Sequence, residues 1–139
     1  MSEGHPWDGL TPDRVHIWNT LGYRLADASE GTVALEWDAP LEYTFPTGDR
    51  LIVHGGMVAT LLDTAMGHVC VAVLGWSSPF LTANLQVEYY RAATPGTLRA
   101  EAEVVNQSRR VVFCAARLYD EAGKLLASAR CTQILRGEA

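Results

Sequence analysis

A single acidic residue interrupts the longest apolar segment of this chain. The segment covers residues 54–75 and reads HGGMVATLLDTAMGHVCVAVLG, with Asp63 near its middle. A carboxylate is costly to bury unless a partner or a chemical task compensates, and residues with perturbed ionisation often belong to functional sites. Asp63 is therefore the first candidate site residue. The alternative is a buried aspartate that caps a neighbouring backbone group.

A His-Gly-Gly turn precedes that acid. His54, Gly55 and Gly56 stand where the apolar segment begins. Glycines at the start of a helix leave backbone N–H groups open to close approach, and the positive end of the helix dipole adds to their attraction for an oxygen atom. The turn is thus a candidate site for a carbonyl oxygen, and the alternative is a plain tight turn.

The elements that must position these residues start with a helix over residues 55–74. Its length is close to the roughly 20 apolar residues that cross a bilayer. Asp63 and His68 within it, and the lack of flanking Lys or Arg clusters in the sequence, argue against a membrane span. A helix that is apolar on all sides instead predicts a sheet wrapped around it.

The rest of the chain predicts one short helix and about six strands, and so an α+β fold. The helix covers residues 12–21, a hairpin covers 23–28 and 32–39, a loop covers 40–53, and four strands cover 80–92, 97–105, 109–119 and 124–135. We expect the last four strands to form an antiparallel meander, because their connections are too short for parallel crossovers. The open edges of such a sheet favour pairing with a second copy.

Composition excludes several classes of protein. A chain of 139 residues with 48% hydrophobic residues predicts one globular domain, and its net charge of −5 argues against nucleic-acid binding. Three cysteines without CxxC or Cys/His spacing argue against a disulfide framework or a metal site. Buried, reduced thiols and an N-terminus without a signal-peptide pattern predict a cytoplasmic protein.

Three sequence features together resemble a known family. They are His54-Gly55-Gly56 followed by six residues and Asp63, the strand LTANLQV at 81–87 with Tyr89 after it, and the hairpin YDEAGKLLA at 119–127. Over residues 15–135 the chain is similar to the hotdog-fold acyl-CoA thioesterases of the phenylacetic-acid-degradation (PaaI-like) type. The resemblance implies a single hotdog domain over 1–139, with residues 1–10 as a loose lead-in, and a curled antiparallel sheet wrapped around one long central helix.

The same resemblance implies the activity and the assembly. It implies hydrolysis of an aryl- or medium-chain acyl-CoA, with no cofactor, because coenzyme A is part of the substrate. In the family, an amide equivalent to that of Gly55 polarises the thioester carbonyl, and a carboxylate equivalent to Asp63 either attacks the thioester carbon or activates a water. The resemblance implies that the two meet across a homodimer interface, and it extends to a homotetramer built as a dimer of dimers.

Further site residues follow from the resemblance. Thr82 occupies the place of a Ser or Thr that hydrogen-bonds the catalytic carboxylate or water, although an outward-facing threonine is an equal alternative. His54 is expected to order the turn rather than to donate protons, and Gly56 to contact substrate. The coenzyme A phosphates are expected to meet arginines near the strand ends. These candidates are Arg91, Arg109 and Arg110, which could equally be surface arginines.

One position departs from the family pattern, and two other functions stay open. Gly48 stands six residues before His54, where the family has Asn or Gln, so Thr47 or Asp49 substitutes or the role is missing. A hotdog hydratase or dehydratase would pair a His with the acid, but His68 points about 140° away from Asp63 on one helix. The other pairing, His54 in the loop before the helix with Asp63 of a second subunit, stays open, although the Gly-Gly after His54 favours hydrolysis. A non-catalytic acyl-CoA-binding module is consistent with Gly48, whereas it has no need of Asp63.

The acyl group itself is not predicted from the residues. We expect an apolar pocket that suits an aryl or medium-length chain, although any fold of this kind has an apolar lining. Its expected lining residues are Met57, Leu61, Leu62, Phe80 and Leu81, with Tyr43 or Phe45 from the loop.

Overall fold

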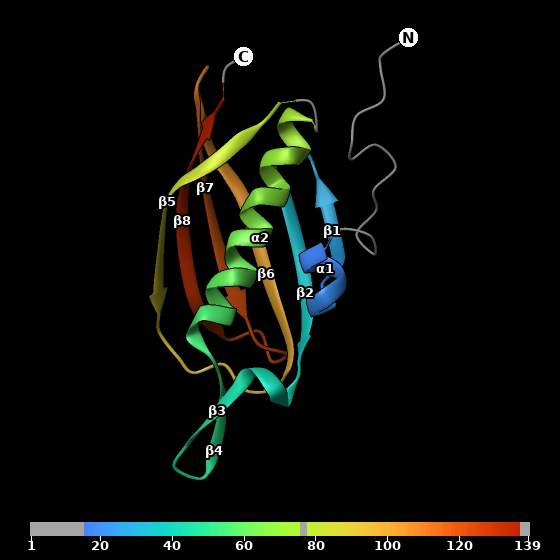
Figure 1. Cartoon of the computed structure of the whole chain (residues 1–139), viewed down its shortest axis with the longest axis vertical. Helices are drawn as coiled ribbons and strands as arrows, with labels where there is room; N and C mark the ends of the chain where they lie inside the picture. The colour runs from blue at the N-terminus through green and yellow to red at the C-terminus, as the bar shows by residue number, and fades with distance from the viewer. Residues whose placement is uncertain (1–15, 76–77, 137–139) are drawn as a thin grey trace.

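The computed structural model describes residues 16–75 and 78–136, and in it a six-stranded antiparallel sheet curls around one long helix, α2 (Figure 1). This is the hotdog architecture that the sequence predicts. The elements are α1 (His16–Leu21), β1 (Arg24–Ser29), β2 (Thr32–Ala39), the 3₁₀ turn η1 (Leu41–Tyr43), β3 (Thr44–Thr47), β4 (Arg50–Val53), α2 (Gly55–Leu74), β5 (Phe80–Tyr89), β6 (Gly96–Gln107), β7 (Val111–Tyr119) and β8 (Leu125–Leu135).

The strand order corrects one part of the predicted topology. The sheet runs β1-β2-β6-β7-β8-β5, so β5 pairs with β8 at the edge and not with β6. Reaching β6 from β5 means passing three strand spacings, about 14 Å, and the six residues 90–95 can span about 20 Å. Residues 90–95 are therefore too few to include a crossover helix, as expected. They are nevertheless long enough to join two strands that are not neighbours in the sheet. Only β6, β7 and β8 form a meander.

The helix α2 packs one face on the concave side of the sheet. Its fully buried residues are Val58, Leu61, Leu62, Ala65, Met66, Val69 and Cys70. The opposite face, which includes Thr60, Asp63 and Gly67, stays partly exposed. The sheet therefore curls around the helix but does not enclose it on every side. By length and composition α2 could cross a membrane, but its packing is that of a core helix.

The segment expected to be a loop contains a hairpin. Strands β3 and β4 pair from Thr44↔Val53 to Thr47↔Arg50, and the hairpin projects beyond the end of the sheet (Figure 1). Gly48 is the first of the two turn residues of this hairpin, and its φ is +64°. Among the described residues, only glycines have positive φ. This combination is the conformation of a type II′ turn, which requires glycine at the first turn residue. Prolines at 40 and 46 conceal the strand pattern in the sequence.

The remaining predicted elements are confirmed where they can be seen. The hairpin of β1 and β2, the strands β6 to β8 and the helix at 55–74 lie where the sequence places them, within a few residues. Of the helix expected at 12–21, the described part is α1. The expected helix start at residues 11–13, the lead-in at 1–10 and part of the turn at 75–79 lie outside the described residues.

Candidate active site

The first turn of α2 presents one backbone amide without an acceptor. His54 is the N-cap: its Nδ1 accepts a hydrogen bond from the Gly56 N–H at 3.0 Å. The His54 carbonyl accepts from the N–H groups of Met57 (2.9 Å) and Val58 (3.2 Å). Within the described residues, no acceptor faces the Gly55 N–H. That amide therefore points out of the positive end of the helix as an available donor.

Tyr89 fixes the position of that amide. Its hydroxyl donates to the Gly55 carbonyl at 2.6 Å, and burial raises the pKa of Tyr89, so the group stays a donor at neutral pH. A Cβ built on Gly55 would lie 3.6 Å from the Tyr89 ring, an ordinary contact distance. Gly55, Tyr89 and Arg91 line a pocket of about 310 Å³ at this end of the sheet. From the sequence, Tyr89 contributes to the family resemblance, but no contact with the Gly55 turn is predicted.

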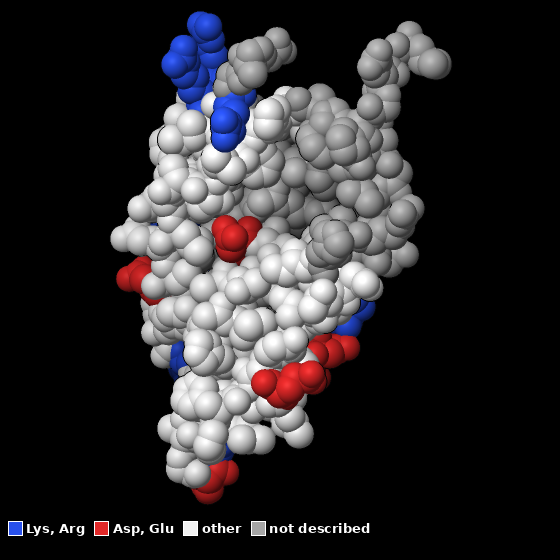
Figure 2. All heavy atoms as spheres, viewed as in Figure 1, with Lys and Arg blue, Asp and Glu red and all other residues white. Residues whose placement is uncertain are grey.

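Asp63 lies in the middle of α2, on the partly exposed face of the helix. The residue is half-buried, and within the described chain its Oδ1 is buried without a hydrogen-bond partner. Burial raises the pKa of Asp63, because the ionised carboxylate is poorly solvated there. Figure 2 shows acidic side-chain atoms at the middle of the face that α2 occupies in Figure 1, with uncharged residues to their left and below. Such a carboxylate is a stronger base than a fully hydrated one.

Gly55 and Asp63 are too far apart on one chain to act on the same atom. Eight residues separate them on the helix, which corresponds to about 12 Å along its axis. A carbonyl group whose oxygen accepts from Gly55 therefore cannot place its carbon beside Asp63 of the same chain. The described chain holds two halves of a candidate site rather than a complete one.

A hydrogen-bond chain, part-buried at Thr82 and buried at Gln133, runs from Thr82 toward Cys131, a thiol that feels the charge of Asp63. The Thr82 hydroxyl donates to Gln133 Oε1 at 2.9 Å, and Gln133 Nε2 donates to Cys131 Sγ at 3.3 Å. The hydrogen bond with Cys114 lowers the pKa of Cys131, and the negative charge of Asp63 acts on that thiol in the opposite direction. Sequence reasoning missed Gln133, although alternation along the strand puts it on the same face as the apolar Cys131.

The three candidate arginines lie at opposite ends of one sheet. Arg91 follows β5, and its N–H donates to the carbonyl of Leu126 at the start of β8. Arg110, next to Arg109, accepts through its carbonyl from Leu135 at the end of β8. The two ends are about 30 Å apart at the rise of a strand. Figure 2 shows basic side chains gathered at the upper end of the molecule, where the β6–β7 turn lies.

The predicted pocket lining is only partly available. Leu61 and Leu62 are 0% exposed and belong to the core, so they do not line an open pocket as expected. Met57 and Phe80 are partly buried, whereas Leu81 is 57% exposed. The His68 ring packs against Trp18 with ring centroids 5.2 Å apart, which gives no support to a His68–Asp63 pair.

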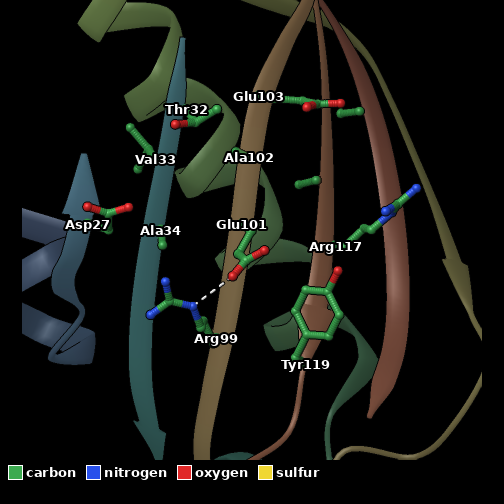
Figure 3. Close-up of a pocket in the computed structure, with 12 residues that line it drawn as sticks. Asp27, Thr32, Val33, Ala34, Arg99, Glu101, Ala102, Glu103, Arg117 and Tyr119 are labelled. Atoms are coloured by element: carbon green, nitrogen blue, oxygen red, sulfur yellow. Dashed lines mark hydrogen bonds and ion pairs between the residues drawn. The ribbon is translucent and has the colours of Figure 1, made fainter. Parts of the chain in front are cut away.

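Another hollow lies on the outer face of the sheet. It measures about 340 Å³ and is formed by side chains of β1, β2, β6 and β7, among them Asp27 of β1, with α2 behind the sheet (Figure 3). Arg99 is held there by ion pairs with Glu101 (2.8 Å) and Glu36 (3.1 Å). None of the residues that line it belongs to the predicted site, so the chemistry is expected on the helix side.

Comparison with known proteins shows that this chain is similar to thioesterases. Residues 52–127 match the family model described as "Thioesterase superfamily". A crystal structure of a protein from the thioesterase superfamily shares 32% identity, covers 89% of this chain and 92% of its own, and superposes with a TM-score of 0.80.

Two further proteins are similar over most of the chain. A protein from Ralstonia eutropha, described as a thioesterase related to phenylacetic acid degradation, has 27% identity, a TM-score of 0.78 and coverage of 86% of this chain and 89% of its own. A protein from Saccharolobus solfataricus named as an esterase is 26% identical over 122 residues, which are 88% of this chain and 79% of that protein.

Proposed function

This chain belongs to the thioesterase superfamily, and on that premise we propose that it hydrolyses an acyl-CoA to a carboxylic acid and free coenzyme A. The observation that carries the proposal is the Asp63 carboxylate, half-buried with its Oδ1 unpartnered within the described chain. Binding alone would not need such a group, because an unpaired buried carboxylate destabilises the fold.

The proposed chemistry divides between the two halves of the site. The Gly55 N–H binds the thioester carbonyl oxygen, and a donor of this kind contributes about 3 kcal/mol of transition-state stabilisation. Asp63 attacks the carbonyl carbon or takes the proton of an attacking water. The thiolate leaves readily, so no cofactor and no Ser-His relay are required. His54 and Gly56 hold the turn, and Thr82 contacts the carboxylate or the water.

The proposed enzyme is a homodimer that shares its sites. Strand β5 is an open edge of ten residues, and its exposed side chains include Leu81, Leu85 and Tyr89. Antiparallel pairing of two β5 edges around a two-fold axis would set the two α2 helices antiparallel. Gly55 of one subunit would then approach Asp63 of the other. Two such dimers form the proposed tetramer.

The same two-fold symmetry would bring the candidate arginines of the two subunits closer together. Because antiparallel pairing exchanges the ends of the sheet, the Arg109 and Arg110 end of one subunit moves toward the Arg91 end of the other. We assign the three to the coenzyme A phosphates, since arginine forms bidentate bonds with phosphate. The aryl- or medium-chain acyl group is supported by the resemblance to phenylacetic-acid-degradation proteins, and a cytoplasmic location by three free, buried cysteines.

Free-thiol release from a panel of acyl-CoA substrates tests the function. We expect Asp63→Asn, which keeps the shape but removes the base, to lower kcat by about 100- to 10,000-fold. Asp27→Asn, a change on the outer face, is the matched control and should leave turnover unchanged. Turnover by Asp63→Asn at the wild-type rate, or no turnover of any substrate by the wild type, would overturn the proposal.

A further inference from the structure

Gln133 is the one polar side chain that is fully buried among the residues the structure describes. It lies on β8, opposite Thr82 of β5 and Val112 of β7. A buried primary amide loses several hydrogen bonds with water, so it is retained only where the protein replaces them. Its Oε1 accepts from the Thr82 hydroxyl at 2.9 Å, and its Nε2 donates to Cys131 Sγ at 3.3 Å. Both ends of the amide are therefore committed.

This arrangement fixes the direction of the Thr82 hydroxyl. A threonine hydroxyl has one hydrogen to donate and two lone pairs. The hydrogen is used toward Gln133 Oε1, which can only accept. Toward any further partner, the Thr82 hydroxyl therefore offers lone pairs alone. An ionised Asp63 is also only an acceptor, so the two groups cannot hydrogen-bond to each other directly.

A water molecule matches such a pair of acceptors, because it has two hydrogens to donate. We propose that Gln133 is a positioning residue that makes Thr82 an acceptor for the attacking water, with Asp63 accepting the second hydrogen as general base. The water would then turn a lone pair toward the thioester carbon. This inference rests on the proposed function and deepens it, because it distinguishes water attack from direct attack by Asp63.

The step balances without a further reactant. The water oxygen bonds to the thioester carbon while one water proton passes to Asp63. The C–S bond then breaks with its electron pair on sulfur, and Asp63 returns the proton to the thiolate. The products are the carboxylic acid and the free thiol.

A double-mutant cycle on kcat separates positioning from a merely structural role. Gln133→Met keeps the side-chain length but frees the Thr82 hydroxyl, and we expect kcat to fall by about 10- to 100-fold. In the Thr82→Val background, Gln133→Met should lower kcat no further. In the Thr82→Ser background, which keeps a hydroxyl, Gln133→Met should lower kcat as much as it does in the wild type. Equal losses in all three backgrounds would overturn the proposal.

The pH profile gives a second readout. Once freed in Gln133→Met, the Thr82 hydroxyl can donate to Asp63, so the acid limb of kcat/KM should move to lower pH. Thr82→Val alone should lower kcat without moving that limb, since the native hydroxyl gives no hydrogen bond to Asp63. An acid limb that moves to higher pH in Thr82→Val would overturn the proposal, even if Gln133→Met does not fold.

A single turnover in ¹⁸O-labelled water checks which atom attacks. Water attack on the thioester puts the label in the released acid and leaves the protein unlabelled. Attack by Asp63 forms a mixed anhydride, and water that opens it at the Asp63 carbonyl puts the label in the protein carboxylate, which overturns the inference. The proposed function fails separately: it falls if Asp63→Asn is fully active, whatever the label shows. If Asp63→Asn is inactive and the wild-type protein carries the label, the thioesterase function stands and only the role of Gln133 is removed.

Discussion

At the scale of single residues, the environment of Asp63 combines a liability for folding with a use in catalysis. Burial raises the pKa of its carboxyl, and within the described residues its Oδ1 has no hydrogen-bond partner. The ionised group is therefore less stable in the folded chain than in water. The same poor solvation makes the carboxylate a better base. Asp63 thus costs stability at neutral pH in return for reactivity.

This trade predicts a pH-dependent effect of Asp63→Asn on stability. Because the folded pKa lies above the unfolded one, wild-type stability falls as the pH rises through the window between the two values. We therefore expect the variant to be more stable than the wild type at pH 7, with the difference shrinking toward about pH 4. Urea midpoints at both pH values measure this, with Asp27→Asn as control.

An equal difference between variant and wild type at both pH values would contradict the expectation. It would mean that the amide changes packing rather than removing a charge. The activity of the wild type should follow the same carboxyl, with an acid limb above the pH expected for a hydrated aspartate.

Part of the candidate site could be predicted at this scale, and part could not. Asp63, Gly55 and His54 stand out because an acid and a Gly-Gly pair are unusual in an apolar helix. The end of the sheet to which Arg91 and Arg110 each belong depends on strand register, which a single sequence does not determine. Gln133 can be recognised as a buried polar residue only when the inward-facing positions of β8 are known. Those positions follow from the pairing of β8 with β7.

At the scale of elements, the first turn of α2 is built to leave one amide unused. The His54 side chain and carbonyl satisfy the next three N–H groups, and Tyr89 holds the Gly55 carbonyl. Gly55 occupies the first helical position, where the fold itself does not need the N–H. Its loss can therefore be tested with little damage to the helix.

Gly55→Pro should remove the amide hydrogen and little else. Proline is favoured at the first helical position, and His54 before it has φ −57° and ψ 134°, which a residue preceding proline adopts readily. We expect kcat to fall about 100-fold or more, the usual effect of losing one oxyanion donor. Gly55→Ala, whose Cβ meets Tyr89 at an ordinary 3.6 Å, is the matched control and should stay close to the wild-type rate. Equal rates in the two variants would contradict the role of the amide.

Elements are also where the sequence-based prediction stops being sufficient. The central helix is predictable because its apolar run is long and ends at Gly75. The β3–β4 hairpin is not, because its strands have four residues each and contain Pro46 and Gly48. Gly48 is explained by the turn: it meets the conformational need of the hairpin tip, so no side chain extends from that position toward the site. We expect Thr47 and Asp49 to be the polar groups of that tip.

At the scale of the whole molecule, the sheet has two open edges that differ in character. Strand β5 is ten residues long and exposed over most of its length, whereas β1 has six residues and interacts through Arg24 with Glu36 and Asp38 of β2. A long edge with exposed apolar side chains is the one more suited to pairing with a second copy.

Leu85→Lys and Leu25→Lys form a matched pair that tests this choice of edge. The two leucines are 38% and 43% exposed, on β5 and β1 respectively. We expect Leu85→Lys to convert the oligomer to monomers, as measured by light scattering after size exclusion, and to abolish thiol release. Leu25→Lys should change neither. The reverse pattern would place the interface at β1.

Mixing two inactive variants tests whether the sites are shared. In a hybrid of Gly55→Pro and Asp63→Asn subunits, one site carries both changes and the other carries neither. Random pairing in a two-fold dimer should therefore restore roughly one quarter of wild-type activity. Activity that stays at the level of the separate variants would show that Gly55 and Asp63 serve the same site from one chain.

The buried cysteines have a practical consequence for all of these measurements. Cys70, Cys114 and Cys131 are each no more than 3% exposed, and burial raises the pKa of Cys70 to about 11. The folded protein should therefore react only slowly with the aromatic disulfide reagents that colour on contact with released coenzyme A. An unfolded variant would expose three thiols per chain and colour at once. One reagent thus reports turnover and also shows whether a silent variant is inactive or merely unfolded.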